Sequence, residues 1–321
     1  GTESDNAAIR GIVERAPASR RHLIVSAFEH HAVLEPVHVL EKAGYDVTYL
    51  APRPEGHIDP DDLRSALRDD TALVSVMHAN NEIGTVQPIR VLAELSHERG
   101  ALFHTDAAQS LGKVPFDVVE FGMDAASFSG HKIYGPKGAG VLYLKRGTPF
   151  APLIRGGGQE FKRRSGTQNV AGAVGFATAL ELMVAEMGAE SVRLAALRDR
   201  VIEGITGRIE NTVVSTTHPD RLPNIAHLII KGVEGEAMLL QLDALGIAVS
   251  TGSACSSGSL EPSHVLLAIG CPPELAHGSV RISLGRQTTA EEVEYFLEAF
   301  PTIVERLRAM SPLYEKMYRS R

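Results

Sequence analysis

Short apolar runs alternate with amphipathic stretches through the first half of the chain, and this alternation constrains the fold most strongly. Five runs have the length and composition of buried strands: residues 23–26, 47–50, 72–77, 101–104 and 125–129. Three intervening stretches have helical periodicity: residues 32–43, 61–68 and 89–99. Strands that alternate with helices of about ten residues predict right-handed crossover units. We therefore expect an α/β fold with a mostly parallel sheet flanked by helices.

Polar residues follow three of these predicted strands. Asn80 and Asn81 follow one strand, Asp106 follows the next, and a Ser-Gly-His-Lys motif at residues 129–132 follows a third. Parallel α/β sheets bind their ligands beyond the carboxyl ends of the strands. The three loops are therefore expected to converge on one crevice.

The second half of the chain predicts a smaller unit. Helical periodicity covers residues 170–187 and 197–209, and we place a domain boundary near this connection. The expected domains are a large one over residues 1–188 and a small α/β one over 189–321. The small domain has one predicted strand and two predicted helices: residues 226–230, 234–242 and 290–308.

Composition excludes several classes of protein. The formal net charge of −7 argues against nucleic acid as a direct substrate, which needs a cationic face. No apolar run approaches the roughly 20 residues of a membrane span, and no secretory leader or metal-spaced His/Cys cluster is visible. The chain has only two cysteines, Cys255 and Cys271, which favours free thiols and a cytoplasmic location.

The residues that follow the strands suit an aromatic aldehyde cofactor. Lys132 can form a Schiff base, and Asp106 can keep a pyridine nitrogen protonated. Ser129 and His131 can donate hydrogen bonds to a phosphate. Together these demands describe pyridoxal 5′-phosphate, whose ring withdraws electrons only while its nitrogen carries a proton.

Six ordered motifs resemble those of the cysteine desulfurases, the NifS/IscS-like group of the class V aminotransferase family. They are Gly-Thr-Glu-Ser-Asp-Asn at residues 1–6, Glu-His-His-Ala-Val-Leu at 29–34, Asn-Asn-Glu-Ile-Gly at 80–84, Arg-Ser-Gly-Thr at 164–167, Gly-Ser-Ala-Cys-Ser-Ser-Gly at 252–258 and Arg-Ile-Ser-Leu-Gly-Arg at 281–286. The resemblance runs through nearly the whole chain. It implies the fold type I of pyridoxal-phosphate enzymes, with a second, smaller α/β domain.

The resemblance also implies how the cofactor is held. Lys132 would carry it and later move protons at the substrate α-carbon, while Asp106 would pair with the ring nitrogen. His30 would stack on the ring. The phenolic oxygen would be reached by Gln109 and Asn81, and the phosphate by Thr2, Ser129, His131 and, from the other subunit of a homodimer, Thr167.

Two further residues set the reaction class. Cys255 lies among small residues and glycines, which is typical of a loop rather than of a packed core. A thiolate there would attack the sulfur of the bound substrate L-cysteine and keep it as a persulfide, releasing L-alanine. The resemblance implies that Arg281, rather than Arg286, would bind the substrate α-carboxylate through paired hydrogen bonds, with a contribution from Asn81.

The leading hypothesis is therefore a cysteine desulfurase that passes sulfur to an acceptor protein. Selenocysteine lyase is the nearest alternative, and an aminotransferase would leave Cys255 without a function. A catalytically silent sulfur-relay partner is the alternative from another class. The pathway stays open among iron–sulfur assembly, tRNA thiolation and DNA thiolation. The tail at residues 311–318 resembles the segment on which relatives dock their acceptors.

The first motif begins at Gly1, whereas family members have a substantial segment before it. We expect the sequence to be a piece of a longer polypeptide, or its leading segment to be disordered, because a frayed Thr2 would bind phosphate poorly. The N-terminal part of the family fold would then be missing from the large domain. An intact mass well above 34.5 kDa would support this expectation.

Overall fold

The computed structural model describes residues 1–252, 261–311 and 314, and it divides the chain into two units. The first unit contains Gly1–Arg53, His57–Asn81 and Val86–Gly188. The second contains Ala189–Arg321 together with two short segments from the first half of the chain, Pro54–Gly56 and Glu82–Thr85.

A six-stranded sheet forms the centre of the first unit, in the order β2-β1-β3-β4-β5-β6. Strands β1 to β5 are parallel, and β6 pairs antiparallel with β5. The strands are β1 (His22–Ser26), β2 (Asp46–Leu50), β3 (Thr71–Ser75), β4 (Leu102–Asp106), β5 (Ala125–Ser129) and β6 (Gly140–Leu144). The expected mostly parallel α/β sheet is confirmed, and the five predicted apolar runs are its five parallel strands. Strand β6 was not predicted from the sequence.

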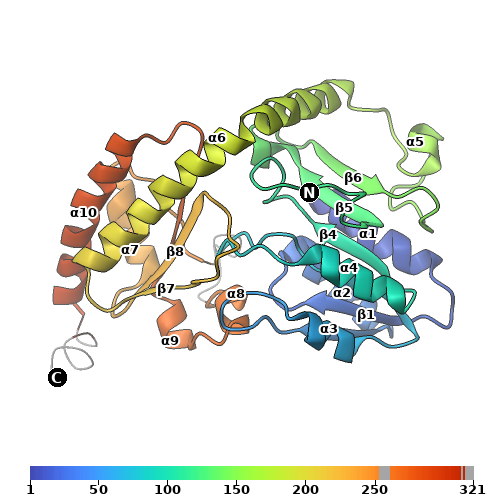
Figure 1. Ribbon diagram of the computed structural model, residues 1–321, viewed down its shortest axis with the longest axis horizontal. Helices are drawn as coiled ribbons and strands as arrows, with labels where there is room; N and C mark the ends of the chain where they lie inside the picture. Colours follow the sequence, from blue (N-terminus) through green and yellow to red (C-terminus); the bar gives the residue numbers. More distant parts are fainter. Residues whose placement is uncertain (253–260, 312–313, 315–321) are drawn as a thin grey trace. The chain divides into compact units, whose positions relative to one another are not determined.

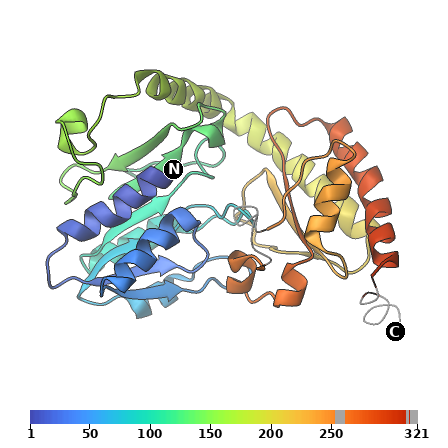
Figure 2. The same cartoon turned by 180° about the vertical axis from the view of Figure 1, so that it is seen from behind.

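Helices cover both faces of this sheet, and β1, β3 and β5 are therefore buried along their whole length. Helix α4 (Ile89–Glu98) lies in front of the sheet in Figure 1, whereas α1 (Thr2–Arg15) and α2 (His31–Lys42) lie in front in Figure 2. Ile9 and Ile12 of α1 pack with Leu23 of β1 and Val33 of α2 in one buried cluster.

Local capping signals explain where two of the helices begin. Asp59 precedes α3 (Pro60–Ala66), and its carboxylate accepts a hydrogen bond from the backbone N–H of Asp61. Thr289 precedes α10 (Ala290–Ala309) and exchanges hydrogen bonds with Glu292, which forms a capping box. Both helices therefore begin where the sequence supplies an oxygen for the unpaired N–H groups of the first turn.

Helix α6 (Val170–Arg208) corrects two expectations from the sequence. It is one continuous helix of 39 residues, not two helices over 170–187 and 197–209. Gly188 lies inside it without ending it, since a helical glycine costs only about 1 kcal/mol relative to alanine. Within the described residues, α6 is also long and apolar enough to cross a membrane by length and composition, which alone is weak evidence.

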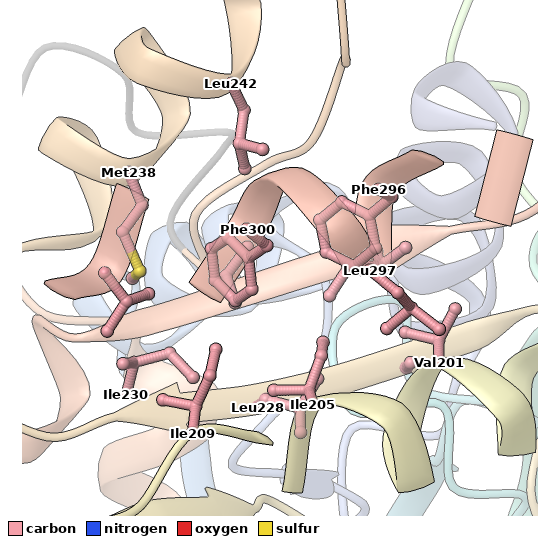
Figure 3. Close-up of a cluster of buried hydrophobic side chains, with 14 of the residues drawn as sticks. Val201, Ile205, Ile209, Leu228, Ile230, Met238, Leu242, Phe296, Leu297 and Phe300 are labelled. Carbon is pink, nitrogen blue, oxygen red and sulfur yellow. The ribbon is translucent and has the colours of Figure 1, made fainter. Parts of the chain in front are cut away.

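A three-stranded antiparallel sheet, β7-β8-β9, forms the centre of the second unit. Its strands are β7 (Thr212–Val214), β8 (Ile225–Ile230) and β9 (Ser279–Ser283). The helices packed around it include α7 (Gly235–Asp243), α8 (His264–Ala268), α9 (Pro273–Ala276) and α10. Figure 3 shows apolar side chains of the second half of α6, β8, α7 and α10 meeting in one core, with Phe296 stacked on Phe300.

Candidate active site

Four neighbouring strands of the first unit deliver polar side chains at one edge of the sheet. His30 follows β1, Asn81 follows β3, Asp106 ends β4 and Ser129 ends β5. These strands are adjacent in the order β1-β3-β4-β5 and run in the same direction. Their carboxyl ends therefore lie at the same edge, and the three expected loops converge there together with a fourth.

Asp106 is a buried carboxyl at the end of β4. Its Oδ1 accepts a hydrogen bond from the backbone N–H of Ala108 at 2.8 Å, which fixes the carboxyl at the strand end. Burial raises the pKa of Asp106, while the Ala108 N–H and the positive charge of Lys132 oppose that shift. Asp106 and Lys132 are therefore close enough for the charge of one to act on the other.

Lys132 lies on a short 3₁₀ helix, η1 (Gly130–Ile133), directly after β5. Tyr134 follows with a φ of +64°, and the Gly135 N–H donates to the Gly130 carbonyl at 2.9 Å, so the chain turns back tightly. Ser129 and His131 share a hydrogen bond between Oγ and Nδ1 at 2.9 Å. The loop thus presents a lysine that is directly preceded by a hydrogen-bonded serine and histidine.

The beginning of α1 lies against the same loop. A Cβ placed on Gly1 would lie 3.4 Å from the Cβ of Ser129, so Thr2 and the first turn of α1 are neighbours of the lysine loop. The first N–H groups of a helix have no acceptor within the helix, which makes this position suitable for an anion. Thr2 itself is exposed.

His30 has a structural role that the sequence did not reveal, because it is the N-cap of α2. Its Nδ1 accepts a hydrogen bond from the Ala32 N–H at 3.1 Å, so the ring proton is on Nε2 in the neutral form. Burial lowers the pKa of His30, and the neighbouring charges of His31 and Lys132 lower it further. The imidazole is therefore held in a fixed orientation and kept neutral.

The two neighbouring asparagines differ in their contacts. The side-chain amide of Asn80 is buried and donates to the Phe28 carbonyl at 3.0 Å, which ties the loop after β1 to the loop after β3. Asn81 is only partly buried and comes directly after this anchor. Gln109 lies in the turn after Asp106, where its carbonyl accepts a hydrogen bond from Lys113 Nζ at 2.8 Å.

Several buried polar residues near this edge were not predicted from the sequence. Glu29 is fully buried and accepts hydrogen bonds from Ser26 Oγ and from the Met77 N–H, and burial raises its pKa to about 8. Asp5 is buried 3.8 Å from the Nε2 of His104, whose pKa burial lowers to about 3. Burial and the charge of Asp106 raise the pKa of Asp5 well above its ordinary range.

Lys113 is a further lysine near the site. Burial lowers its pKa to about 8, and the charge of Lys132 adds to this effect. Its position four residues after Gln109, in the same turn region, was the only signal in the sequence that could have identified it.

The remaining expected site residues lie in other elements than these strand-end loops. Thr167 is exposed in the connection between α5 (Gln159–Lys162) and α6. Arg281 belongs to the second unit, where it lies in β9 opposite His227 of β8 and pairs with Ser250 through two backbone hydrogen bonds. Arg286 is exposed beyond that strand. Cys255 lies outside the described residues.

The donor set of the first unit fits pyridoxal 5′-phosphate. Lys132 suits the aldehyde, and the buried Asp106 carboxyl, which lies within reach of the lysine charge, suits the ring nitrogen. The neutral imidazole of His30 suits the face of the ring. The hydroxyl and N–H donors at the start of α1 and in the lysine loop suit the phosphate.

Comparison with known proteins agrees with this chemistry. The profile of the aminotransferase class V family matches residues 1–296. The chain belongs to this family. Enzymes of this class V family depend on pyridoxal 5′-phosphate.

Two curated relatives and one solved structure refine the class V assignment. The cysteine desulfurase IscS of Dictyoglomus turgidum is 52% identical, over 97% of this chain and 79% of the relative. The cysteine desulfurase IscS of Methanosarcina thermophila is 51% identical, over 100% of this chain and 79% of the relative. A solved NifS-like protein superposes with a TM-score of 0.89 at 37% identity, covering 95% of this chain and 81% of that protein.

Proposed function

We infer that this protein is a cysteine desulfurase that uses pyridoxal 5′-phosphate. It converts L-cysteine to L-alanine and retains the sulfur as a persulfide. The observation that carries this conclusion is the convergence of a lysine, a buried aspartate and a capped histidine on adjacent strand ends. This arrangement occurs in a chain about half identical to enzymes named cysteine desulfurase.

The first unit supplies the residues that hold the cofactor. When bound, the cofactor supplies an aldehyde for the substrate amine and a protonated ring that accepts electrons from the substrate α-carbon. Asp106 holds the proton on the ring nitrogen, and His30 keeps the ring in place with its fixed, neutral imidazole. Lys132 binds the cofactor and then takes and returns the α-carbon proton.

The phosphate and phenolic oxygen have their own donors in this proposal. Ser129, His131 and the first turn of α1 at Thr2 bind the phosphate. Gln109 and Asn81 bind the phenolic oxygen, and Asn81 also faces the substrate.

The sulfur leaves the substrate through the second unit. Arg281 binds the α-carboxylate of L-cysteine, since a guanidinium offers two parallel donors. The Cys255 thiolate attacks the substrate sulfur, so that an S–S bond forms as the C–S bond breaks. The electron pair of that C–S bond returns to the substrate carbon with a proton, and the products are L-alanine and a Cys255 persulfide.

The test is to incubate the cofactor-loaded protein with L-cysteine and to measure both products. We expect one alanine for each persulfide in a single turnover, and mass spectrometry should locate the added sulfur on Cys255. Cys255→Ser should bind L-cysteine, with a change in cofactor absorbance, but release no alanine. Cys271→Ser, which changes the other cysteine of the chain, is the matched control and should act as the wild type.

Two results would contradict the proposal. Near-wild-type alanine release by Cys255→Ser would remove the thiolate from the mechanism. A strong preference for L-selenocysteine over L-cysteine would favour a selenocysteine lyase instead.

We also place a second copy of this chain on the first half of α6. Val170, Val174, Leu182 and Val184 are apolar residues of this half, and each is at least half exposed. An exposed apolar helix face of this length is typical of an interface between proteins. A homodimer through this face would leave Thr167, three residues before α6, placed to reach the partner's cofactor.

The oligomeric state tests the homodimer directly. Val174→Glu should shift the protein toward the monomer in analytical ultracentrifugation, because a carboxylate would be buried in the interface. Val39→Glu, at a similarly exposed valine of α2, is the control and should leave the dimer unchanged. A Val174→Glu variant that stays dimeric would place the interface elsewhere.

The sulfur acceptor is proposed to be a protein with a thiol that docks near residues 311–318, in the cytoplasm. Two cysteines without a disulfide framework suit a reducing compartment. Capture of partners by the persulfidated enzyme, with and without residues 312–321, tests this proposal. Equal capture by the truncated chain would exclude the tail as the docking segment.

A further inference from the structure

A short segment from the first half of the chain is built into the second unit. Glu82–Thr85 comes directly after Asn81, but it belongs to the unit that contains Arg281. The carbonyl of Gly84 accepts a hydrogen bond from the Leu222 N–H at 2.7 Å, and Thr85 forms an antiparallel bridge with Arg221. These backbone contacts fix the position of Glu82 within the second unit.

The side chain of Glu82 is buried between two residues that are distant from it in the sequence. Its Oε2 accepts a hydrogen bond from the hydroxyl of Ser263. A Cβ on Gly252 would lie 3.1 Å from the same Oε2, 3.1 Å from Ser279 Oγ and 3.2 Å from Ser263 Cβ. The Gly252 N–H also donates to Ser279 Oγ at 3.4 Å. Gly252 is therefore packed closely on the carboxyl, and a side chain there would require its neighbours to shift by a few tenths of an ångström.

These two neighbours of Glu82 bracket the reactive cysteine in the sequence. Gly252 precedes Cys255 by three residues, and Ser263 follows it by eight. Ser263 is itself a fixed point, because its Oγ also accepts from the Leu266 N–H at 3.3 Å and so caps α8. One carboxyl thus contacts both fixed ends of the stretch of chain that carries the nucleophile.

We propose that Glu82 is a positioning residue for sulfur transfer, because its carboxyl holds Gly252 and Ser263 in place on either side of Cys255. This inference rests on the proposed desulfurase function. It assigns Glu82 no contact with substrate or cofactor.

The charge environment agrees with a role in holding neighbours together. Burial raises the pKa of Glu82 to about 7, while the Ser263 hydrogen bond and the charge of Arg281 oppose the shift. Glu82 and Arg281 therefore attract each other when the carboxyl is ionised. His227, opposite Arg281 in the sheet, adds no positive charge near neutral pH, since burial lowers its pKa to about 3.

The first test compares Glu82→Ala with Glu82→Gln in the cofactor-loaded enzyme. Glu82→Ala should slow persulfide formation in a single turnover by about tenfold, as expected for the loss of one buried hydrogen bond and its packing. The KM for L-cysteine and the cofactor absorbance should stay within about twofold. Glu82→Gln keeps an acceptor for Ser263 and should recover most of the rate.

A second readout does not depend on turnover. In a Cys271→Ser background, Cys255 is the one thiol of the chain, and its alkylation by iodoacetamide can be followed by mass. Glu82→Ala should raise this alkylation rate by about threefold or more, because the two ends are no longer fixed. Glu82→Gln should stay near the background rate.

A double-mutant cycle makes the proposed contact specific. Gly252→Ala has no backbone conflict, since no positive φ occurs at Gly252, so its cost comes from the Cβ against the Glu82 carboxyl, Ser279 Oγ and Ser263 Cβ. Because Glu82→Ala removes one of these three contacts, Gly252→Ala should slow persulfide formation more in the wild type than in the Glu82→Ala background. If Glu82→Ala does not fold, Gly252→Ala and Ser263→Ala disturb one end each and carry the same test.

Three results would overturn the proposal. Glu82→Ala could match the wild type in both persulfide formation and alkylation. Glu82→Ala could instead weaken the binding of cofactor and L-cysteine by as much as it slows persulfide formation. Such a result would indicate a general effect on the structure. Gly252→Ala could be equally harmful in both backgrounds. If the wild type releases no alanine at all, the desulfurase function fails, while alkylation still reports on Glu82.

Discussion

Each unit of this protein buries a glutamate, and the two carboxyls bind different kinds of neighbour. Glu29 of the first unit joins Ser26, at the end of β1, to the backbone after β3, so it fixes two adjacent strands of a parallel sheet. Glu82 of the second unit contacts Gly252 and Ser263, which are separated by the stretch that carries Cys255. The first carboxyl supports strand ends, and the second supports the two ends of a connection.

This difference matches the different tasks proposed for the two units. The proposed cofactor residues follow strands of one sheet, so their spacing is set by the strand pairing, with local anchors such as Ala108 for Asp106. The proposed nucleophile, Cys255, lies in the sequence between Gly252 and Ser263, and both of these residues contact the Glu82 carboxyl.

The largest expected effect comes from removing the lysine of the first unit. Lys132→Ala should abolish the visible absorbance of the lysine–cofactor link and the label introduced by borohydride reduction, because no other residue matches the family position. Lys137→Ala, which changes an exposed lysine five residues later, is the control and should keep both signals. A reducible link at another lysine in the Lys132→Ala protein would refute the assignment.

The two buried glutamates should make stability depend on pH over different ranges. Burial raises the pKa of Glu29 from 4.5 to about 8 and that of Glu82 from 4.5 to about 7. A raised folded-state pKa means that the folded protein binds more protons than the unfolded chain above pH 4.5. The stabilisation is complete below that pH and is lost as the pH rises through the folded-state pKa.

Replacement by glutamine should remove this loss. Relative to wild type, the melting temperature of Glu29→Gln should rise with pH until about pH 8, and that of Glu82→Gln until about pH 7. The upper limits are about 5 and about 3 kcal/mol of unfolding free energy, at 1.36 kcal/mol per pKa unit. Glu35→Gln, whose side chain is 67% exposed, is the control. A buried variant whose melting temperature follows that of the wild type at every pH would contradict the raised pKa of that glutamate.

The sequence predicted the fold best where periodicity was strong. The five parallel strands are short apolar runs that could be predicted without any tertiary information, and three of them, β1, β3 and β5, are buried along their whole length. Strand β6 was missed because it follows a glycine-rich turn and lies at the sheet edge, where burial is partial. The continuity of α6 was missed because helical periodicity was recognised only over residues 170–187 and 197–209, and the residues between them were left unassigned.

The site shows a similar division. Lys132, Asp106, His30 and Asn81 could be proposed because motifs placed them after strands. Glu29 and Glu82 are letters of the same motifs, yet nothing in a motif says that a glutamate is buried. Their burial raises both pKa values, and they are buried against residues as distant as Met77 and Ser263, whose hydrogen bonds partly oppose that rise. Contacts between residues far apart in the sequence cannot be predicted from local sequence. The catalytic candidates could therefore be identified from motifs, whereas the positioning residues could not.

The smallest of these expected effects concerns Arg281, the substrate-binding candidate of the second unit. Arg281→Lys keeps the positive charge beside Glu82 but loses the paired donors of the guanidinium. Binding of L-cysteine should weaken by about 1.5–3 kcal/mol, which appears as a raised KM with little change in the absorbance of the cofactor-loaded enzyme. Arg286→Lys, at the exposed arginine beyond the strand, is the matched control and should bind L-cysteine normally. Because Arg281 and Glu82 lie in the second unit, the change should leave borohydride labelling of Lys132 intact. Unchanged cysteine affinity in Arg281→Lys would assign the substrate carboxylate to another cation.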